Sequence, residues 1–229
     1  MAEARSFDPI WEEKYAAGHA QRYPWDAVVS FIFRHAPRER ARSEVKILEV
    51  GCGTGSNLWF AAREGFSVAG VDASASAIRA AEDRFRADGL NGDLRVADFT
   101  SLPFEAGQFD LAIDRAALSC CGRSAARRAI AEVRRVLKAG GRLLFMPYSA
   151  AHSSRASGRM GPDGLVLGIS AGTLVGAGQI CFWSEDDVLA AFARGWTLER
   201  LEHVEARERR DHAQGVHAEW RCVARRTDD

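Results

Sequence analysis

A glycine-rich turn near residue 50 is the feature of this sequence that most restricts its fold. Residues 49–55 read EVGCGTG; they end an apolar run at 45–50 that predicts a buried strand, and they precede a helical pattern at 56–63. Glycines at such a turn let the backbone approach a ligand closely, and the first turn of the helix presents free N–H groups. The turn therefore predicts an α/β chain with a ligand site at the end of its first strand.

The rest of the chain alternates short apolar runs with helical patterns, which is typical of a parallel sheet covered by helices. Strands are expected at 67–71, 93–97, 109–113 and 142–146, helices at 74–87 and 124–138, and two closing strands near 196–204 and 216–224, joined by a charged arm at 205–212. Ser184 and the three acids after it predict the start of another helix. Residues 148–180 are rich in Gly, Ser and Ala without a clear period, which indicates a functional loop or a poorly ordered one.

The residues of the glycine turn distinguish among the ligands that such turns bind. A phosphate-binding loop carries GxxxxGK before Ser or Thr, and no lysine stands here. A dinucleotide site favours GxGxxG, but Ser56 occupies the position of the third glycine. Glu49 ends the first strand, where a carboxylate would repel a pyrophosphate and attract an ammonium or a sulfonium. S-adenosylmethionine carries both cationic groups and no phosphate, so the turn favours it over a nucleotide cofactor.

Acidic residues also stand at the ends of three further predicted strands. Asp72 ends the second strand and could accept hydrogen bonds from ribose hydroxyls, a role that suits NAD equally well. Asp98 and Phe99 end the third strand, where the carboxylate could accept from an adenine amino group and the ring could pack on its face. Asp114 ends the fourth strand. All lie at carboxyl ends of strands, where open α/β sheets bind ligands.

Five motifs in order, ILEVGCGTGSN, VDAS, VADFTSLPF, FDLAID and LKAGGRLLF, make residues 45–147 resemble the class I S-adenosylmethionine-dependent methyltransferases. The resemblance implies a Rossmann-like α/β fold, a mostly parallel seven-stranded sheet with helices on both faces and one antiparallel strand. It predicts a single domain made of an N-terminal helical lid, a cofactor-binding core, an acceptor-pocket insertion and a closing segment, at 1–44, 45–147, 148–183 and 184–229. More faintly, the whole chain is similar to bacterial methyltransferases of surface-polysaccharide or secondary-metabolite pathways.

The resemblance also assigns parts of the cofactor to residues. The glycine turn and Glu49 would line the methionine end, and Asp72 would hold the ribose. Asp98 and Phe99 would hold the adenine, and Asp114 would lie beside the transferring methyl group. The full set of expected cofactor-binding residues is Tyr15, Arg22, Glu49, Gly51, Cys52, Gly53, Gly55, Asp72, Ala73, Asp98, Phe99, Asp114 and Arg115.

The N-terminal segment resembles the lid of small-molecule members of this superfamily, which folds over the cofactor. Trp11, Tyr15 and the stretch from Arg22 to Trp25 carry this likeness. Arg22 would bind the methionine carboxylate, whereas the aromatic residues of the segment are favoured more as packing residues than as ligand contacts.

Methyl transfer depends mostly on in-line positioning and desolvation, because the sulfonium is already a good leaving group. A base helps when the acceptor is a hydroxyl or an ammonium. Tyr148 and His152 follow the fifth strand, where this fold places acceptor-binding loops, so they are the candidate catalytic residues. The alternative is a His152 that braces its own loop.

The composition narrows the partners and the compartment. Lys+Arg and Asp+Glu are both 31, which argues against a nucleic-acid partner and favours a small metabolite or sugar as the acceptor. Five cysteines without a CxxC pair predict neither disulfides nor a metal site, and hence a cytoplasmic protein. Neither a secretory signal nor an apolar run long enough to span a membrane is expected.

Two functions other than methyl transfer stay open at this stage. An NAD-dependent oxidoreductase would use the same Asp72, although Glu49 and Ser56 speak against it. A non-catalytic S-adenosylmethionine-binding partner subunit would carry the same cofactor residues, because a methyltransferase needs no particular nucleophile whose loss would reveal inactivity.

Overall fold

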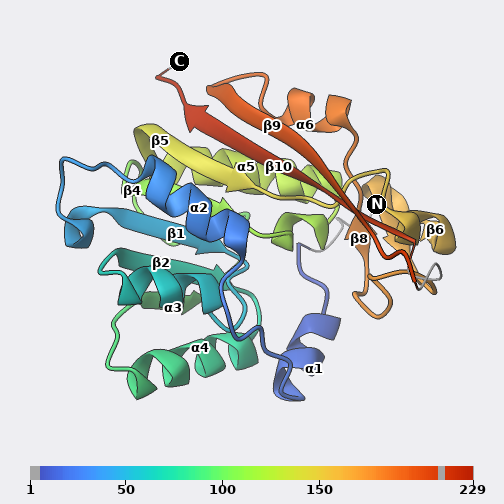
Figure 1. Cartoon of the computed structure of the whole chain (residues 1–229), viewed down its shortest axis with the longest axis horizontal. Coiled ribbons are helices and arrows are strands. Elements are labelled where there is room, and N and C mark those ends of the chain that lie inside the picture. The colour runs from blue at the N-terminus through green and yellow to red at the C-terminus, as the bar shows by residue number, and fades with distance from the viewer. Residues whose placement is uncertain (1–5, 211–214, 229) are drawn as a thin grey trace.

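Residues 6–210 and 215–228 are described by the computed structural model, and they form a seven-stranded sheet with helices on both faces (Figure 1). The strand order is β3-β2-β1-β4-β5-β10-β9. The strands are β1 (Lys46–Val50), β2 (Ser67–Asp72), β3 (Asp93–Val96), β4 (Phe109–Asp114), β5 (Leu137–Phe145), β9 (Trp196–Arg207) and β10 (Val216–Arg226). The helices are α1 (Ile10–Ala16), α2 (Asp26–His35), α3 (Ser56–Arg63), α4 (Ala75–Ala87), α5 (Arg123–Val136) and α6 (Glu185–Ala191), with short 3-10 turns η1 (Arg42–Glu44) and η2 (Ala117–Ser119).

The directions of these strands agree with the predicted fold class. β1 pairs in parallel with β2 and β4, and the pairs β2 with β3 and β4 with β5 are also parallel. β10 runs antiparallel to both of its neighbours, β5 and β9. Within the described residues, the expected mostly parallel seven-stranded sheet with one antiparallel strand is therefore confirmed.

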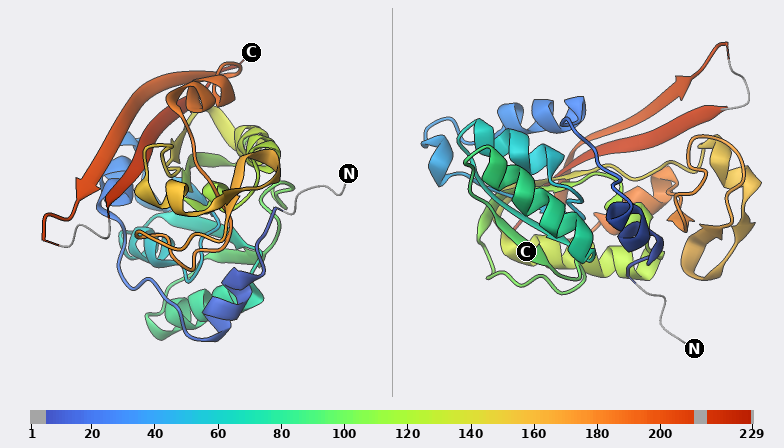
Figure 2. Two further views of the ribbon diagram at one scale, coloured as in Figure 1. Left: turned by 90° about the vertical axis from the view of Figure 1, so that its right-hand side faces the viewer. Right: turned by 90° about the horizontal axis from the view of Figure 1, so that it is seen from below.

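The central strands are buried on both faces, which explains why they read as continuous apolar runs instead of alternating ones. On one face, Leu48 and Phe145 pack in a cluster with the buried stripe of α5. On the other face, Ile47 and Leu111 pack in a cluster with α2 and α3. This layering leaves the carboxyl ends of the parallel strands directed towards α1 and the insertion (Figures 1 and 2).

One predicted boundary is wrong for a physical reason. The helix expected at 124–138 ends at Val136, because Leu137 is fully buried and pairs with Phe109 as the first residue of β5. The register between β4 and β5 then shifts, and Gly140 takes a φ of +73° within the strand. The strand expected at 142–146 therefore begins five residues earlier, and Gly140 and Gly141 lie inside β5.

The insertion at 148–183 is more ordered than the sequence pattern indicates. This fully described part of the chain holds η3 (Ser153–Ser157), η4 (Pro162–Gly164) and a three-stranded sheet of β6 (Arg159–Met160), β7 (Leu165–Leu167) and β8 (Ile180–Cys181). An apolar cluster of its own, with Val166, Leu174 and Phe182, packs this sheet. Strands of two or three residues are too short to leave a period in a sequence, so the segment is ordered although its sequence shows no period.

The closing strands form a long ribbon. In the right-hand view of Figure 2, β9 and β10 extend beyond the rest of the sheet on the side of the insertion. β9 continues to Arg207, past its predicted end, so the charged arm expected at 205–212 is partly strand; 211 and 212 lie outside the described residues. In residues 6–210 and 215–228, no helix has the length and apolarity needed to cross a membrane.

Candidate functional site

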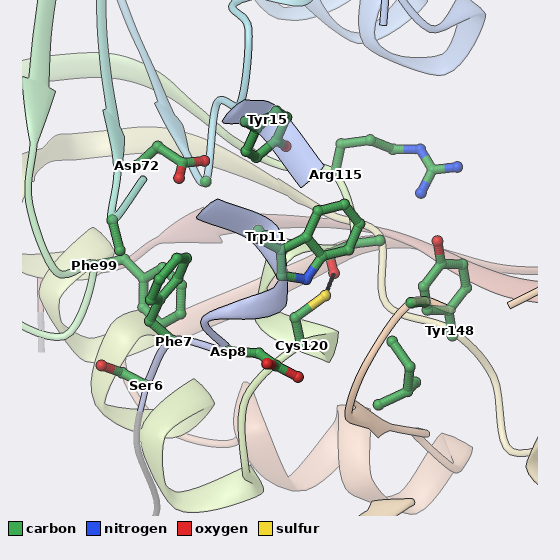
Figure 3. Close-up of a pocket in the computed structure, with 16 residues that line it drawn as sticks. Ser6, Phe7, Asp8, Trp11, Tyr15, Asp72, Phe99, Arg115, Cys120 and Tyr148 are labelled. Atoms are coloured by element: carbon green, nitrogen blue, oxygen red, sulfur yellow. Dashed lines mark hydrogen bonds between the residues drawn. The ribbon is translucent and has the colours of Figure 1, made fainter. Parts of the chain in front are cut away.

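A cavity of about 140 Å³ lies where the carboxyl ends of the central strands meet α1 and the insertion (Figure 3). The predicted site residues that line it are Tyr15, Gly51, Asp72, Ala73, Phe99, Arg115 and Tyr148. A second cavity, of about 110 Å³, shares Tyr15, Gly51 and Arg115 with the first and is lined also by Glu49, Cys52 and Gly53. The fold thus brings together most of the residues that the sequence predicted, from segments far apart in the chain.

The glycine turn is bare on its cavity side because side chains would collide there. Gly51 has a φ of +63°, and a Cβ at this position would clash with Ala117 Cβ. Gly53 has a φ of +52°, and a Cβ would lie 2.6 Å from the Tyr15 hydroxyl oxygen. Gly55 lines neither cavity and lies against Ala81 of α4. The first two positions therefore need glycine both for conformation and for space.

Asp72 joins the glycine turn to the end of β2. Its Oδ2 accepts a hydrogen bond from Gly53 N–H at 2.9 Å, and its Oδ1 accepts one from Ser74 N–H at 2.8 Å. Burial raises the pKa of this carboxyl, and the two backbone hydrogen bonds partly offset that effect. A carboxylate offers about four lone-pair sites, so both oxygens can still accept from a ligand in the cavity.

Two buried carboxyl groups at neighbouring strand ends each keep one oxygen unpaired. Glu49 Oε1 accepts from Asn57 Nδ2 at 2.6 Å, and Asp114 Oδ1 accepts from Leu118 N–H at 2.9 Å. Glu49 Oε2 and Asp114 Oδ2 have no hydrogen-bond partner among the described residues. Burial raises the pKa of Glu49 to about 8 and that of Asp114 to about 7. Glu49 lines the second cavity, whereas Asp114 is fully buried and lines neither, so the structure does not place Asp114 beside a bound ligand as expected. A cationic donor next to Glu49 Oε2 would restore the ionised form of that carboxyl.

The N-terminal segment covers the cavity and is held by polar contacts. No residue of α1, which is described throughout, is buried. The Ser6 hydroxyl donates to Asp98, and Asp8 Oδ2 accepts from Gln179 N–H at 2.9 Å. Glu12 accepts from the hydroxyl of Ser76 at 2.6 Å and from that of Ser74, the cap residue of α4. These hydrogen bonds lower the pKa of Glu12 to about 2.

Phe99 and Asp98 are placed differently from each other. The Phe99 ring is buried and lines the cavity beside Asp72. Asp98 is exposed, lines neither cavity, and already accepts from Ser6 and from the N–H and hydroxyl of Thr100. Partial burial raises the pKa of Asp98, but the hydrogen bonds from Ser6 and Thr100 outweigh burial, so its pKa is lowered overall. An adenine amino group would have to displace Ser6 to reach this carboxylate.

The structure does not bring Arg22 to the site, because its side chain is exposed and lines neither cavity. Arg115 is the arginine that lines both. Its Nη2 lies 3.2 Å from Glu219 Oε2, and its guanidinium carbon lies 3.9 Å from the centre of the Trp25 ring. The positive charge at the cavities therefore comes from the residue that directly follows Asp114.

Of the two candidate catalytic residues, Tyr148 lines the cavity and His152 does not. His152 Nδ1 accepts from Ser154 N–H at 3.1 Å, and its Nε2 lies 3.2 Å from His217 Nδ1 and 3.1 Å from Thr173 Oγ1. Burial and the charge of His217 lower its pKa to about 4. His152 is thus occupied in bracing its own loop and is not placed to take a proton from a molecule in the cavity.

Sequence reasoning missed three acids that shape the site, Asp8, Glu12 and Glu219. The first two anchor the N-terminal segment, and Glu219 holds Arg115 from the reversed strand β10. The one available signal was the position of Glu219 within a predicted closing strand, between the apolar residues Ala218 and Trp220. Among the described residues, no group of three or more His, Cys, Asp or Glu side chains is arranged to hold a metal ion.

Comparisons with known proteins agree on one class. Residues 47–141 match the family model of a methyltransferase domain. The ubiquinone/menaquinone biosynthesis C-methyltransferase of Bordetella avium is 37% identical over 115 residues, which are 49% of this chain and 44% of that protein. The chain spans less than half the length of the curated relatives that it matches.

Two solved structures share the fold over nearly the whole chain. A protein of echinomycin biosynthesis, studied for the conversion of a disulfide bond into a thioacetal group, has a TM-score of 0.70 and 24% identity and covers 95% of this chain and 91% of its own. A SAM-dependent methyltransferase of Methanosarcina mazei has a TM-score of 0.69 and 23% identity, with coverage of 86% and 97%. At these identities the likeness establishes the fold.

Proposed function

Residues 47–141 are a methyltransferase domain of the class I superfamily, which uses S-adenosylmethionine, and on that premise we propose that this chain transfers a methyl group from S-adenosylmethionine to a small-molecule acceptor. The observation that carries the proposal is the cavity at the strand ends, where the bare glycine turn, Asp72 and Phe99 face one space. The unpaired oxygen of Glu49, which lines the second cavity, suits a cationic ligand group and, when ionised, would repel a pyrophosphate.

The residues present fit the proposed cofactor. The glycine turn and Glu49 would hold the methionine end, Asp72 the ribose and Phe99 the adenine. When bound, S-adenosylmethionine supplies an electrophilic methyl group on a good leaving group. The task of the chain is then to hold the acceptor in line with that methyl and to exclude water, and the N-terminal segment and the insertion are placed to do both.

Three observations support a small molecule as the acceptor. The cavity is about 140 Å³ in volume and is bordered by α1 and the insertion, dimensions that suit a small group of atoms. The formal net charge of the chain is zero, whereas duplex binding usually requires a basic excess. Two of the similar proteins are described in the biosynthesis of small molecules, a quinone and echinomycin.

All five cysteines are unpaired, which supports a reducing compartment such as the cytoplasm.

Calorimetric titration of the purified chain tests the cofactor. We expect saturable binding of S-adenosylmethionine and of its demethylated product S-adenosylhomocysteine, and none of NAD run in parallel. Binding of NAD alone would contradict the proposal and indicate an NAD-dependent oxidoreductase. Cofactor binding without methylated product from any small acceptor would instead indicate a non-catalytic partner subunit, and methylation of bulk RNA or protein alone would exclude the small-molecule assignment.

A further inference from the structure

The part of the cavity away from the cofactor residues has a distinct chemistry. Figure 3 shows Asp72 and Phe99 on one side, Arg115 and Tyr148 on the other, and Trp11 between them. The second side is completed by Cys120, Ala177 and Ile180, which come from the loop after β4 and from the insertion. This end of the cavity is apolar and flanked by aromatic rings.

Three hydrogen-bond donors at this end lack a strong acceptor among the described residues. The indole N–H of Trp11 faces the Cys120 sulfur, which is a weak acceptor, and makes no other hydrogen bond. The Nε–H of Arg115 is buried and has no partner. The Tyr148 hydroxyl points toward Arg115 (Figure 3), whose guanidinium has no acceptor to offer, so the hydroxyl proton remains available.

The nearby acids do not supply the missing acceptors. Asp8 lines this end and accepts from Ile10 N–H at 3.1 Å and from Gln179 N–H, but it accepts from neither the Trp11 indole N–H nor the Arg115 Nε–H. Glu219 Oε2 lies 3.2 Å from Arg115 Nη2, and Glu219 Oε1 accepts from Arg221 Nε at 2.9 Å. Glu219 thus holds the end of the guanidinium and leaves the Arg115 Nε–H without a partner. Buried donors left without acceptors are costly, which indicates that a ligand brings an acceptor oxygen to this end.

The same donors select the charge of that oxygen. Hydrogen bonds from a guanidinium to an anionic oxygen are shorter and stronger than those to a neutral one. A cationic ligand would instead meet the positive charge of Arg115 and the sulfonium of the cofactor. The expectation of a planar ligand comes from the cavity walls. The aromatic rings of Trp11 and Tyr148 line this end, and the side chains of Ile180 and Ala177 carry no polar group.

We propose that the methyl acceptor is a planar, largely apolar molecule with one anionic oxygen, a carboxylate, phenolate or enolate, that Arg115, Tyr148 and Trp11 bind. This inference rests on the proposed function in calling the ligand the methyl acceptor. The chemistry of its binding rests on the side chains alone. It predicts weak binding of cationic amines, which Arg115 repels although Asp8 also lines the cavity, and of polyols, whose hydroxyl groups would find few acceptors there.

Binding of matched small probes tests the inference. The full chain, saturated with S-adenosylhomocysteine, is titrated with benzoate, benzamide, benzylammonium and cyclohexanecarboxylate, with ligand-observed NMR as the readout. We expect benzoate to bind at least about tenfold more tightly than benzamide and than cyclohexanecarboxylate, and benzylammonium not to bind. Benzoate no tighter than benzamide would overturn the proposal.

Variants assign the preference to residues. Arg115→Met should remove the preference for benzoate over benzamide, and Tyr148→Phe, which keeps the ring, should reduce it several-fold. Arg127→Met removes an exposed arginine of α5 outside both cavities and should leave the preference intact. An unchanged preference in both cavity variants would overturn the assignment.

Titration with S-adenosylhomocysteine distinguishes failure of the proposed function from failure of the inference about the acceptor. Failure of S-adenosylhomocysteine to bind the native chain would contradict the proposed function alone. The same probes titrated into the chain without S-adenosylhomocysteine would still test the anionic preference, because all three donors belong to the chain.

Discussion

At the scale of single residues, Asp72 carries two backbone hydrogen bonds and still faces the cavity. Asp72→Ala removes the proposed acceptors for the ribose hydroxyls, so we expect S-adenosylmethionine affinity to fall by about 1.5–3 kcal/mol. Calorimetry measures this change, with Asp83→Ala, an exposed acid of α4, as the matched control. An unchanged affinity in a folded Asp72→Ala variant would remove Asp72 from the site.

Glu49 makes the stability of the ligand-free chain depend on pH. Burial raises its pKa from 4.5 to about 8, so the folded chain binds more protons than the unfolded chain between these values. The stabilising contribution of the protonated group is fully present below about pH 4.5 and is lost as the pH rises through about 8. We expect Glu49→Gln, which stays uncharged, to lose less stability than the native chain between about pH 5 and pH 8. Thermal unfolding at both pH values measures this, and equal losses in the two proteins would contradict it.

At the scale of elements, α1 depends on its anchors because it buries no residue. Glu12→Ala removes the acceptors for Ser74 and Ser76, so amide hydrogen exchange in residues 10–16 should accelerate while β1 stays protected. Glu13→Ala, which changes an exposed neighbour on the same helix, is the control and should leave exchange unchanged. Equal exchange in the Glu12→Ala variant and the native chain would show that other contacts hold α1.

Elements with a strong local signal were predictable, and those fixed by distant contacts were not. The helix at 56–63 and the start of α6 follow from apolar spacing and from the capping box of Ser184 and Asp187. The start of β5 at Leu137 depends on pairing with β4, and the short strands of the insertion depend on their own cluster. Neither of these contacts leaves a period in the sequence.

At the scale of the whole molecule, a bound ligand should stabilise the fold. S-adenosylhomocysteine at a hundred times its Kd contributes about 2.7 kcal/mol, which for a chain of this size raises the Tm by about 5–10 °C. Thermal unfolding with and without the ligand measures the shift, and NAD at the same concentration should cause none. A shift with NAD and none with S-adenosylhomocysteine would reverse the cofactor assignment.

In the site as a whole, the residues at strand ends and Tyr148 in the proposed acceptor half were predictable, but the way that the two proposed halves are joined was not. The glycine turn, Asp72 and Phe99 sit at strand ends, a position that follows from the order of elements. The acceptor half joins Trp11, Arg115 and Tyr148 through the path of the N-terminal segment and the insertion. No local rule gives that path, which is why Arg22 and His152 were assigned to a site that they do not line.

The N-terminal segment also bears on the timing of a catalytic cycle. Its anchors, Ser6, Asp8 and Glu12, attach to three different parts of the molecule, and the ligand beneath can leave freely only when they release together. If the three contacts open independently, the probability that all three are open at once is the product of the three separate probabilities. It is therefore far lower than the probability that any single contact is open. Weakening the hydrogen bonds of Glu12 should therefore shorten the residence time of spent cofactor without altering a residue that lines either cavity.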